Sequence, residues 1–159
     1  MPESRTLRLA DAAATQASGA RLGQALALAD DSSAFVVNLS GELGSGKTTL
    51  VRGALRSLGI ADTIRSPTYA LIETYSVDGR TLAHLDLYRL SSPGELETLG
   101  VRDLLLPGHL LFVEWPERGA GALPEPDVAL RLHFQGEART LHVEARSERG
   151  RAVVQEWFR

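Results

Sequence analysis

The segment GELGSGKT, residues 41–48, constrains the fold of this chain more than any other stretch of its sequence. It matches the pattern G-x-x-x-x-G-K-[ST] without a mismatch, and such a loop lets backbone N–H groups converge on phosphate oxygens. The pattern requires a buried strand before it and an amphipathic helix after it. Both are indicated, because residues 35–39 (FVVNL) are mostly apolar and the stretch after Lys47 carries apolar residues at helical spacing.

The other segments alternate between strand-like and helix-like patterns. Asp11 is a helix cap before the alanine-rich residues 12–29, and Gly59 is placed to end the helix that follows the loop. Hairpins are predicted to join residues 69–77 to 81–88, through Asp78-Gly79, and 128–134 to 141–145. A short helix ends near Gly100, and residues 110–113 form a buried strand. These elements predict one α/β domain over residues 1–159, a P-loop NTPase-like three-layer α/β/α fold with a mixed central sheet and antiparallel hairpins.

Charge and composition narrow the possible functions. A net charge of −3 argues against a protein that binds nucleic acid on its own. The absence of cysteine and the scattered histidines predict no structural zinc, and we expect neither a signal peptide nor a membrane span, so the predicted location is the cytoplasm. The cationic tail is predicted to be a solvated face; its arginines are Arg146, Arg149, Arg151 and Arg159.

Two carboxylates at strand ends are candidates to complete the loop. Glu114 follows the apolar run 110–113, so we predict that it binds Mg²⁺ together with the hydroxyl of Thr48. Asp86 is predicted to position or activate the attacking water, or to hold a metal-bound water. The alternative for Asp86 is a structural pairing with Arg89 or Arg65.

Other residues near these carboxylates have two open interpretations. Residues 66–68 (Ser-Pro-Thr) are either a segment that senses the terminal phosphate, through Ser66 and Thr68, or an ordinary turn. Trp115 either packs under the nucleotide or fills the core, and His84 is either functional or a packing histidine. Tyr88 and Arg89 are interpreted as local scaffold.

The motifs GELGSGKTT, SPTY, HLDLYRL and VEWPERG, in this order and with these gaps, resemble the TsaE (YjeE) family of small bacterial phosphate-loop ATPases. The resemblance implies a role in forming threonylcarbamoyladenosine (t6A) at position 37 of tRNAs that read codons starting with A. It implies the TsaB and TsaD proteins as partners, with TsaD transferring the group and tRNA contacted only through them. It also implies that Thr48 and Glu114 bind magnesium, that Asp86 is the family's aspartate, and that Thr15 lies near the base.

The predicted function is therefore Mg²⁺-dependent binding and slow, partner-dependent hydrolysis of ATP. The predicted catalytic residues are Lys47, Asp86 and Glu114. The predicted nucleotide contacts are Thr15, Gly41, Gly44, Ser45, Gly46, Lys47, Thr48, Thr49, Ser66, Thr68 and Trp115. Two alternatives remain, a small-molecule kinase and a scaffold that binds nucleotide without hydrolysing it. A GTPase is disfavoured because the chain has no N-K-x-D segment.

Overall fold

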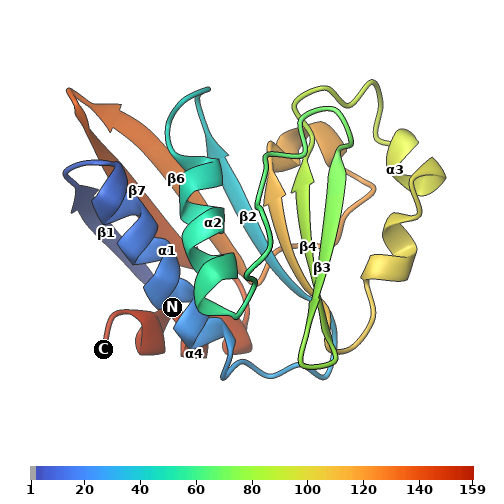
Figure 1. Cartoon of the computed structure of the whole chain (residues 1–159), viewed down its shortest axis with the longest axis horizontal. Helices are drawn as coiled ribbons and strands as arrows, with labels where there is room; N and C mark the ends of the chain where they lie inside the picture. The colour runs from blue at the N-terminus through green and yellow to red at the C-terminus, as the bar shows by residue number, and fades with distance from the viewer. Residues whose placement is uncertain (1–2) are drawn as a thin grey trace.

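Seven strands form one mixed sheet in the computed structural model, which describes residues 3–159 (Figure 1). Their order is β1-β7-β6-β2-β5-β4-β3. The strands are β1 Ser4–Leu9, β2 Phe35–Gly41, β3 Ile72–Val77, β4 Arg80–Asp86, β5 Leu110–Glu114, β6 Val128–Gln135 and β7 Ala138–Ala145. Strand β2 lies between β5 and β6 and is parallel to both, and β4 is parallel to β5. The pairs β1–β7, β6–β7 and β3–β4 are antiparallel, so the predicted mixed sheet and both predicted hairpins are confirmed.

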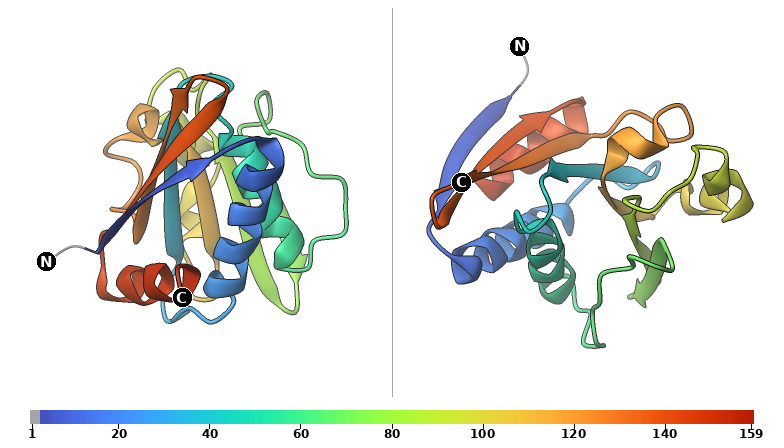
Figure 2. Two further views of the ribbon diagram at one scale, coloured as in Figure 1. Left: turned by 90° about the vertical axis from the view of Figure 1, so that its left-hand side faces the viewer. Right: turned by 90° about the horizontal axis from the view of Figure 1, so that it is seen from above.

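Helices cover both faces of the sheet (Figures 1 and 2). They are α1 Ala12–Leu26, α2 Lys47–Ser57, α3 Glu95–Thr98 and α4 Glu148–Trp157, with 3₁₀ turns η1 Val101–Leu104 and η2 Pro116–Gly119. One core cluster joins α1, α2 and α4 to one face, and a smaller cluster joins α3 and η1 to the other. This is the predicted three-layer arrangement. None of the helices within residues 3–159 is long and apolar enough to cross a membrane.

Helices α1 and α2 pack closely because each carries a glycine at the contact. A Cβ atom on Gly19 would lie 2.1 Å from the carbonyl oxygen of Leu50, and one on Gly53 would lie 2.2 Å from that of Gln16. Helix α1 begins where predicted, since the Asp11 side chain accepts a hydrogen bond from the backbone N–H of Ala14 at 2.8 Å. The close packing of α1 against α2 fixes the position of α2, and therefore that of the loop that precedes it.

Besides the two 3₁₀ turns, one strand and one α-helix are not predicted from the sequence, and one prediction is wrong in part. Strand β1 forms an edge of the sheet beside β7, and α4 forms from the arginine-rich tail. The prediction of a solvated face holds for Arg146, Arg151 and Arg159, which are exposed. It is wrong for Arg149, which is largely buried and pairs with Asp127. Helix α4 also buries the apolar side chains of Val153, Val154 and Trp157. One face of the tail is therefore part of the core, and the other is exposed.

Candidate functional site

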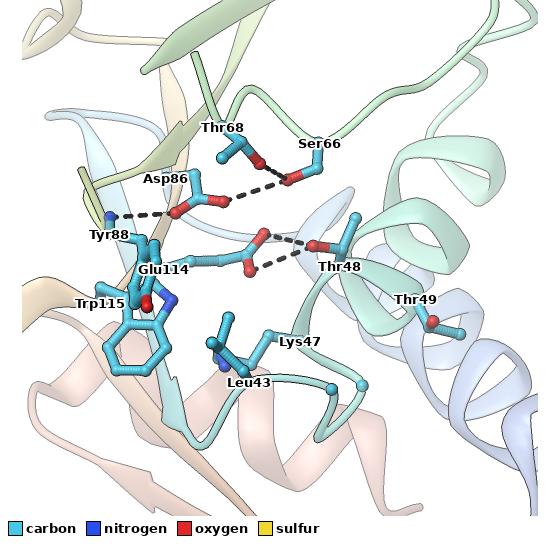
Figure 3. Close-up of a pocket in the computed structure, with 12 residues that line it drawn as sticks. Leu43, Lys47, Thr48, Thr49, Ser66, Thr68, Asp86, Tyr88, Glu114 and Trp115 are labelled. Atoms are coloured by element: carbon cyan, nitrogen blue, oxygen red, sulfur yellow. Dashed lines mark hydrogen bonds between the residues drawn. The ribbon is translucent and has the colours of Figure 1, made fainter. Parts of the chain in front are cut away.

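A cleft of about 250 Å³ lies where β2, β4 and β5 end (Figure 3). The carboxyl ends of these parallel strands meet at one edge of the sheet, which is the usual position of binding sites in open α/β sheets. The cleft is lined by Leu43, Gly44, Gly46, Lys47, Thr48, Thr49, Ser66, Thr68, Asp86, Tyr88, Glu114 and Trp115. The structure thus brings together most of the residues predicted from the four motifs.

The loop between β2 and α2 has a backbone that requires glycine. Gly41, Gly44 and Gly46 have φ angles of 145°, 77° and 106°, which side chains rarely allow. A Cβ atom on Gly41 would also lie 2.5 Å from the carbonyl oxygen of Leu132. Helix α2 begins at Lys47 without a side-chain cap, so no capping side chain accepts hydrogen bonds from its first backbone N–H groups. A helix N-terminus of this kind favours an anion.

Lys47 is folded back onto the loop. Its side chain is 4% exposed, and its ammonium group donates hydrogen bonds to the carbonyl oxygens of Gly41, at 2.7 Å, and Glu42, at 2.9 Å. It also lies 4.5 Å from the ring centroid of Trp115. Burial lowers the pKa of Lys47, and the nearby carboxylates of Glu114 and Asp86 oppose that shift. The cleft therefore holds a partly desolvated cation beside two carboxylates.

Thr48 and Glu114 face each other across the cleft. The Thr48 hydroxyl donates to the two carboxylate oxygens of Glu114 at 2.9 and 3.1 Å (Figure 3). Glu114 is 3% exposed, and its second partner is the buried ring of His84, whose Nε2 lies 2.5 Å from Oε2. The structure places Thr48 beside the carboxylate at the end of β5, and the binding of Mg²⁺ by this pair stays a prediction.

Asp86 lies beside Glu114 in the register of β4 and β5. Its carboxylate accepts hydrogen bonds from the hydroxyl of Ser66 and the backbone N–H of Tyr88, both at 3.1 Å. Ser66 and Thr68 share a further hydrogen bond of 3.0 Å, so the 66–68 segment is tied to the cleft through Asp86 (Figure 3). Within residues 3–159 no ion pair joins Asp86 to an arginine, whereas Arg89 stacks on the exposed ring of Tyr69.

Three predicted contacts lie outside this cleft. Gly41 and Ser45 form the base of the loop, and Ser45 is fully buried. Thr15 lies behind the loop, where its hydroxyl donates to the carbonyl oxygen of Asp11 at 3.2 Å. It borders a separate hollow of about 120 Å³ that also includes Gly46, Thr49 and Arg139.

Sequence reasoning missed two residues that line the cleft. Leu43 is 61% exposed at a position where the loop pattern accepts any residue, so the pattern carried no signal for it. Tyr88, which the sequence assigns to the local scaffold, has its ring 5.0 Å from that of Trp115 at the cleft wall. The alternation that places His84, Asp86 and Tyr88 on one face was the available signal for Tyr88. Trp115 is partly buried; it packs against the smaller core cluster and also lines the cleft.

Comparison with known proteins identifies the family of this chain. A relative from Haemophilus influenzae, described as tRNA threonylcarbamoyladenosine biosynthesis protein TsaE, is 36% identical over 152 residues that cover 96% of each chain. A protein of the same description from Streptomyces coelicolor is 39% identical over 117 residues, which cover 72% of this chain and 75% of the relative. The crystal structure of Bacillus subtilis YdiB has a similar fold, with a TM-score of 0.80 at 24% identity over 99% of this chain and 96% of the other. The model of the family described as threonylcarbamoyl adenosine biosynthesis protein TsaE matches residues 9–145. The chain therefore belongs to the TsaE family.

Proposed function

We propose that this chain binds ATP and Mg²⁺ in the cleft and hydrolyses the ATP in support of t6A formation at position 37 of tRNAs that read codons starting with A. The relatives described as tRNA threonylcarbamoyladenosine biosynthesis proteins support the tRNA part of the proposal. The chain acts with the TsaB and TsaD proteins, and TsaD transfers the threonylcarbamoyl group. The role of this chain is to sustain turnover of their complex.

The observation that carries the ATP proposal is the pairing of Thr48 with Glu114 beside Lys47. The loop offers backbone N–H groups and the Lys47 ammonium group to a polyphosphate. Both are close to the two carboxylates, within one cleft (Figure 3). A glycine turn without a ligand would not need a buried cation beside two largely buried acids.

The donor atoms at this point suit a magnesium ion. The hydroxyl of Thr48 and the carboxylate of Glu114 are oxygen ligands, which Mg²⁺ prefers, and Mg²⁺ commonly uses one or two carboxylates together with substrate phosphates. The ion would neutralise charge on the phosphates during hydrolysis. Lys47 would contact the outer phosphates, while Asp86, held by Ser66, would orient a water molecule.

The charge of the chain supports an indirect contact with tRNA. With a net charge of −3, the chain lacks the excess of cations that holds a phosphate backbone. We therefore assign tRNA binding to the partner proteins.

Titration of ATP into the Lys47→Ala variant tests the site. We expect binding to weaken by about 100-fold or more, because the variant loses the charge-assisted contact to phosphate. Arg131→Ala, which removes an exposed cation on β6, is the matched control and should bind ATP as the parent chain does. Unchanged affinity in Lys47→Ala would refute the assignment of the loop.

Reconstitution tests the biological role. The number of t6A modifications per TsaB–TsaD complex should rise when this chain and ATP are added, and should not rise with Lys47→Ala. Phosphate transfer to a small metabolite would instead favour a kinase. Tight binding of ATP with no hydrolysis, even with the partners present, would favour a scaffold.

A further inference from the structure

His84 is a fully buried histidine whose side chain, among residues 3–159, is hydrogen-bonded to Glu114 alone. It lies on β4, where its register partner on β5 is Phe112, and its exposed fraction is 0%. Its Nε2 lies 2.5 Å from Oε2 of Glu114. Because an ionised carboxylate can only accept hydrogen bonds, Nε2 carries the hydrogen and donates it.

The other ring nitrogen of His84 makes no hydrogen bond. Nδ1 is buried and has no partner among the described residues. Leaving a buried polar atom unpaired costs free energy, so an apolar side chain of similar size would suit this core position better. The one hydrogen bond that the ring does make is directed at the carboxylate proposed to bind Mg²⁺. This arrangement favours a role for His84 at the cleft over a role in packing.

We propose that His84 is a positioning residue that fixes the carboxylate of Glu114 for Mg²⁺, an inference that rests on the function proposed above. The hydroxyl of Thr48 is shared between both carboxylate oxygens, at 2.9 and 3.1 Å, so it does not distinguish them. His84 binds Oε2 alone, so its hydrogen bond is the contact that distinguishes the two oxygens and limits rotation of the carboxylate. Among the described residues Oε1 accepts a hydrogen bond from Thr48 alone, so it has lone pairs left for a ligand. Hydrogen bonds of this kind orient metal ligands in many proteins.

Two substitutions separate positioning from packing. His84→Gln places an amide donor near the position of Nε2, whereas His84→Leu has a similar volume and no donor. If His84→Leu does not fold, His84→Asn replaces it, because the shorter amide ends near Nδ1 and does not reach Glu114. Thermal unfolding without nucleotide shows whether each variant is folded.

The measured quantity is the Mg²⁺ concentration that gives half-maximal binding of a non-hydrolysable ATP analogue to the full chain. Binding is monitored by calorimetric titration. We expect His84→Leu to raise this concentration about 10-fold or more, and His84→Gln to stay within about 3-fold of the parent chain. Binding of the analogue in EDTA should be the same in all three proteins. An unchanged Mg²⁺ dependence in His84→Leu, or equal shifts in both variants, would overturn the positioning role.

Glu114→Gln distinguishes this failure from a failure of the proposed function. A shifted Mg²⁺ dependence in Glu114→Gln, without one in His84→Leu, rejects His84 and keeps Glu114 as the ligand. If the parent chain binds the analogue without regard to Mg²⁺, the proposed magnesium site is wrong and the role of His84 falls with it.

Discussion

Replacing Arg149 by alanine should destabilise the fold far more than replacing the nearby Arg146. The guanidinium group of Arg149 donates to both carboxylate oxygens of Asp127, at 2.9 and 3.1 Å, and Asp127 is 7% exposed. It also donates to the backbone carbonyl oxygens of Asp30, Ser33 and Ala34. Arg146 instead pairs with Glu144 and Glu125, and its side chain is 45% exposed. The two residues differ in burial and number of partners, not in charge.

The expected magnitude follows from that burial. Removing one partner of a buried ion pair costs about 3–5 kcal/mol, and we expect the lower end, about 3 kcal/mol, because the Arg149 side chain is 18% exposed. In a domain of this size each kcal/mol lowers the unfolding midpoint by about 2–4 °C, so the midpoint of Arg149→Ala should fall by about 6–12 °C. Arg146→Ala should lose no more than about 1 kcal/mol, as exposed pairs usually do.

Urea unfolding followed by circular dichroism measures both variants against the parent chain. The slope of the transition should stay unchanged, which would show that the loss is in the native fold rather than in the extent of the surface exposed on unfolding. If the two variants lose equal free energy of unfolding, the Asp127–Arg149 pair does not anchor α4 and the reasoning fails.

Three further predictions concern the helix contact and the cleft. Gly53→Ala should lower the free energy of unfolding by about 1–3 kcal/mol, because its Cβ would lie 2.2 Å from the carbonyl oxygen of Gln16; a gain in stability by chemical denaturation would contradict this. Burial lowers the pKa of Lys47 from 10.5, so between the lowered pKa and 10.5 the unfolded chain binds more protons and stability should rise with pH. Lys47→Met should lack this rise, so the difference in free energy of unfolding between the parent chain and the variant should grow with pH when measured by denaturation at several alkaline pH values. A difference that stays constant would show that Lys47 is not the source of the rise. Glu114→Gln should lower Mg²⁺-dependent phosphate release from ATP at least about 10-fold while affinity for ATP falls less; equal losses would argue against a role in hydrolysis.

The fold was predictable where local pattern and tertiary position agree. The loop, its strand and α2 have both a motif and the expected apolar periodicity. Strand β1 has no motif and only a short alternation, Leu7 and Leu9 on either side of Arg8, because it lies at the sheet edge. Helix α4 was missed because its charges suggested a solvated segment, although a single arginine, Arg149, turns inward to Asp127. That pairing joins residues far apart in the sequence, which no local pattern records.

The composition of the site was easier to predict than its internal contacts. Glu114 and Asp86 follow from their positions at strand ends, since parallel strands meet at one edge. The contact of His84 with Glu114 depends on the pairing of β4 with β5 and on the side-chain conformations of both residues. Alternation along β4 gave the face of His84 but not its partner. The place of Thr15 behind the loop likewise depends on how α1 packs on α2.

The central position of β2 affects how the protein can fold while it is being synthesised. The strand that precedes the glycine loop is held on one side by β5 and on the other by β6, which are made much later in synthesis. Sheets built from such distant segments form slowly and only after the distant segment has emerged. A nascent chain that ends before Val128 therefore lacks the strand that pairs with one edge of β2, and we expect the loop to acquire its final shape only after β6 has been made.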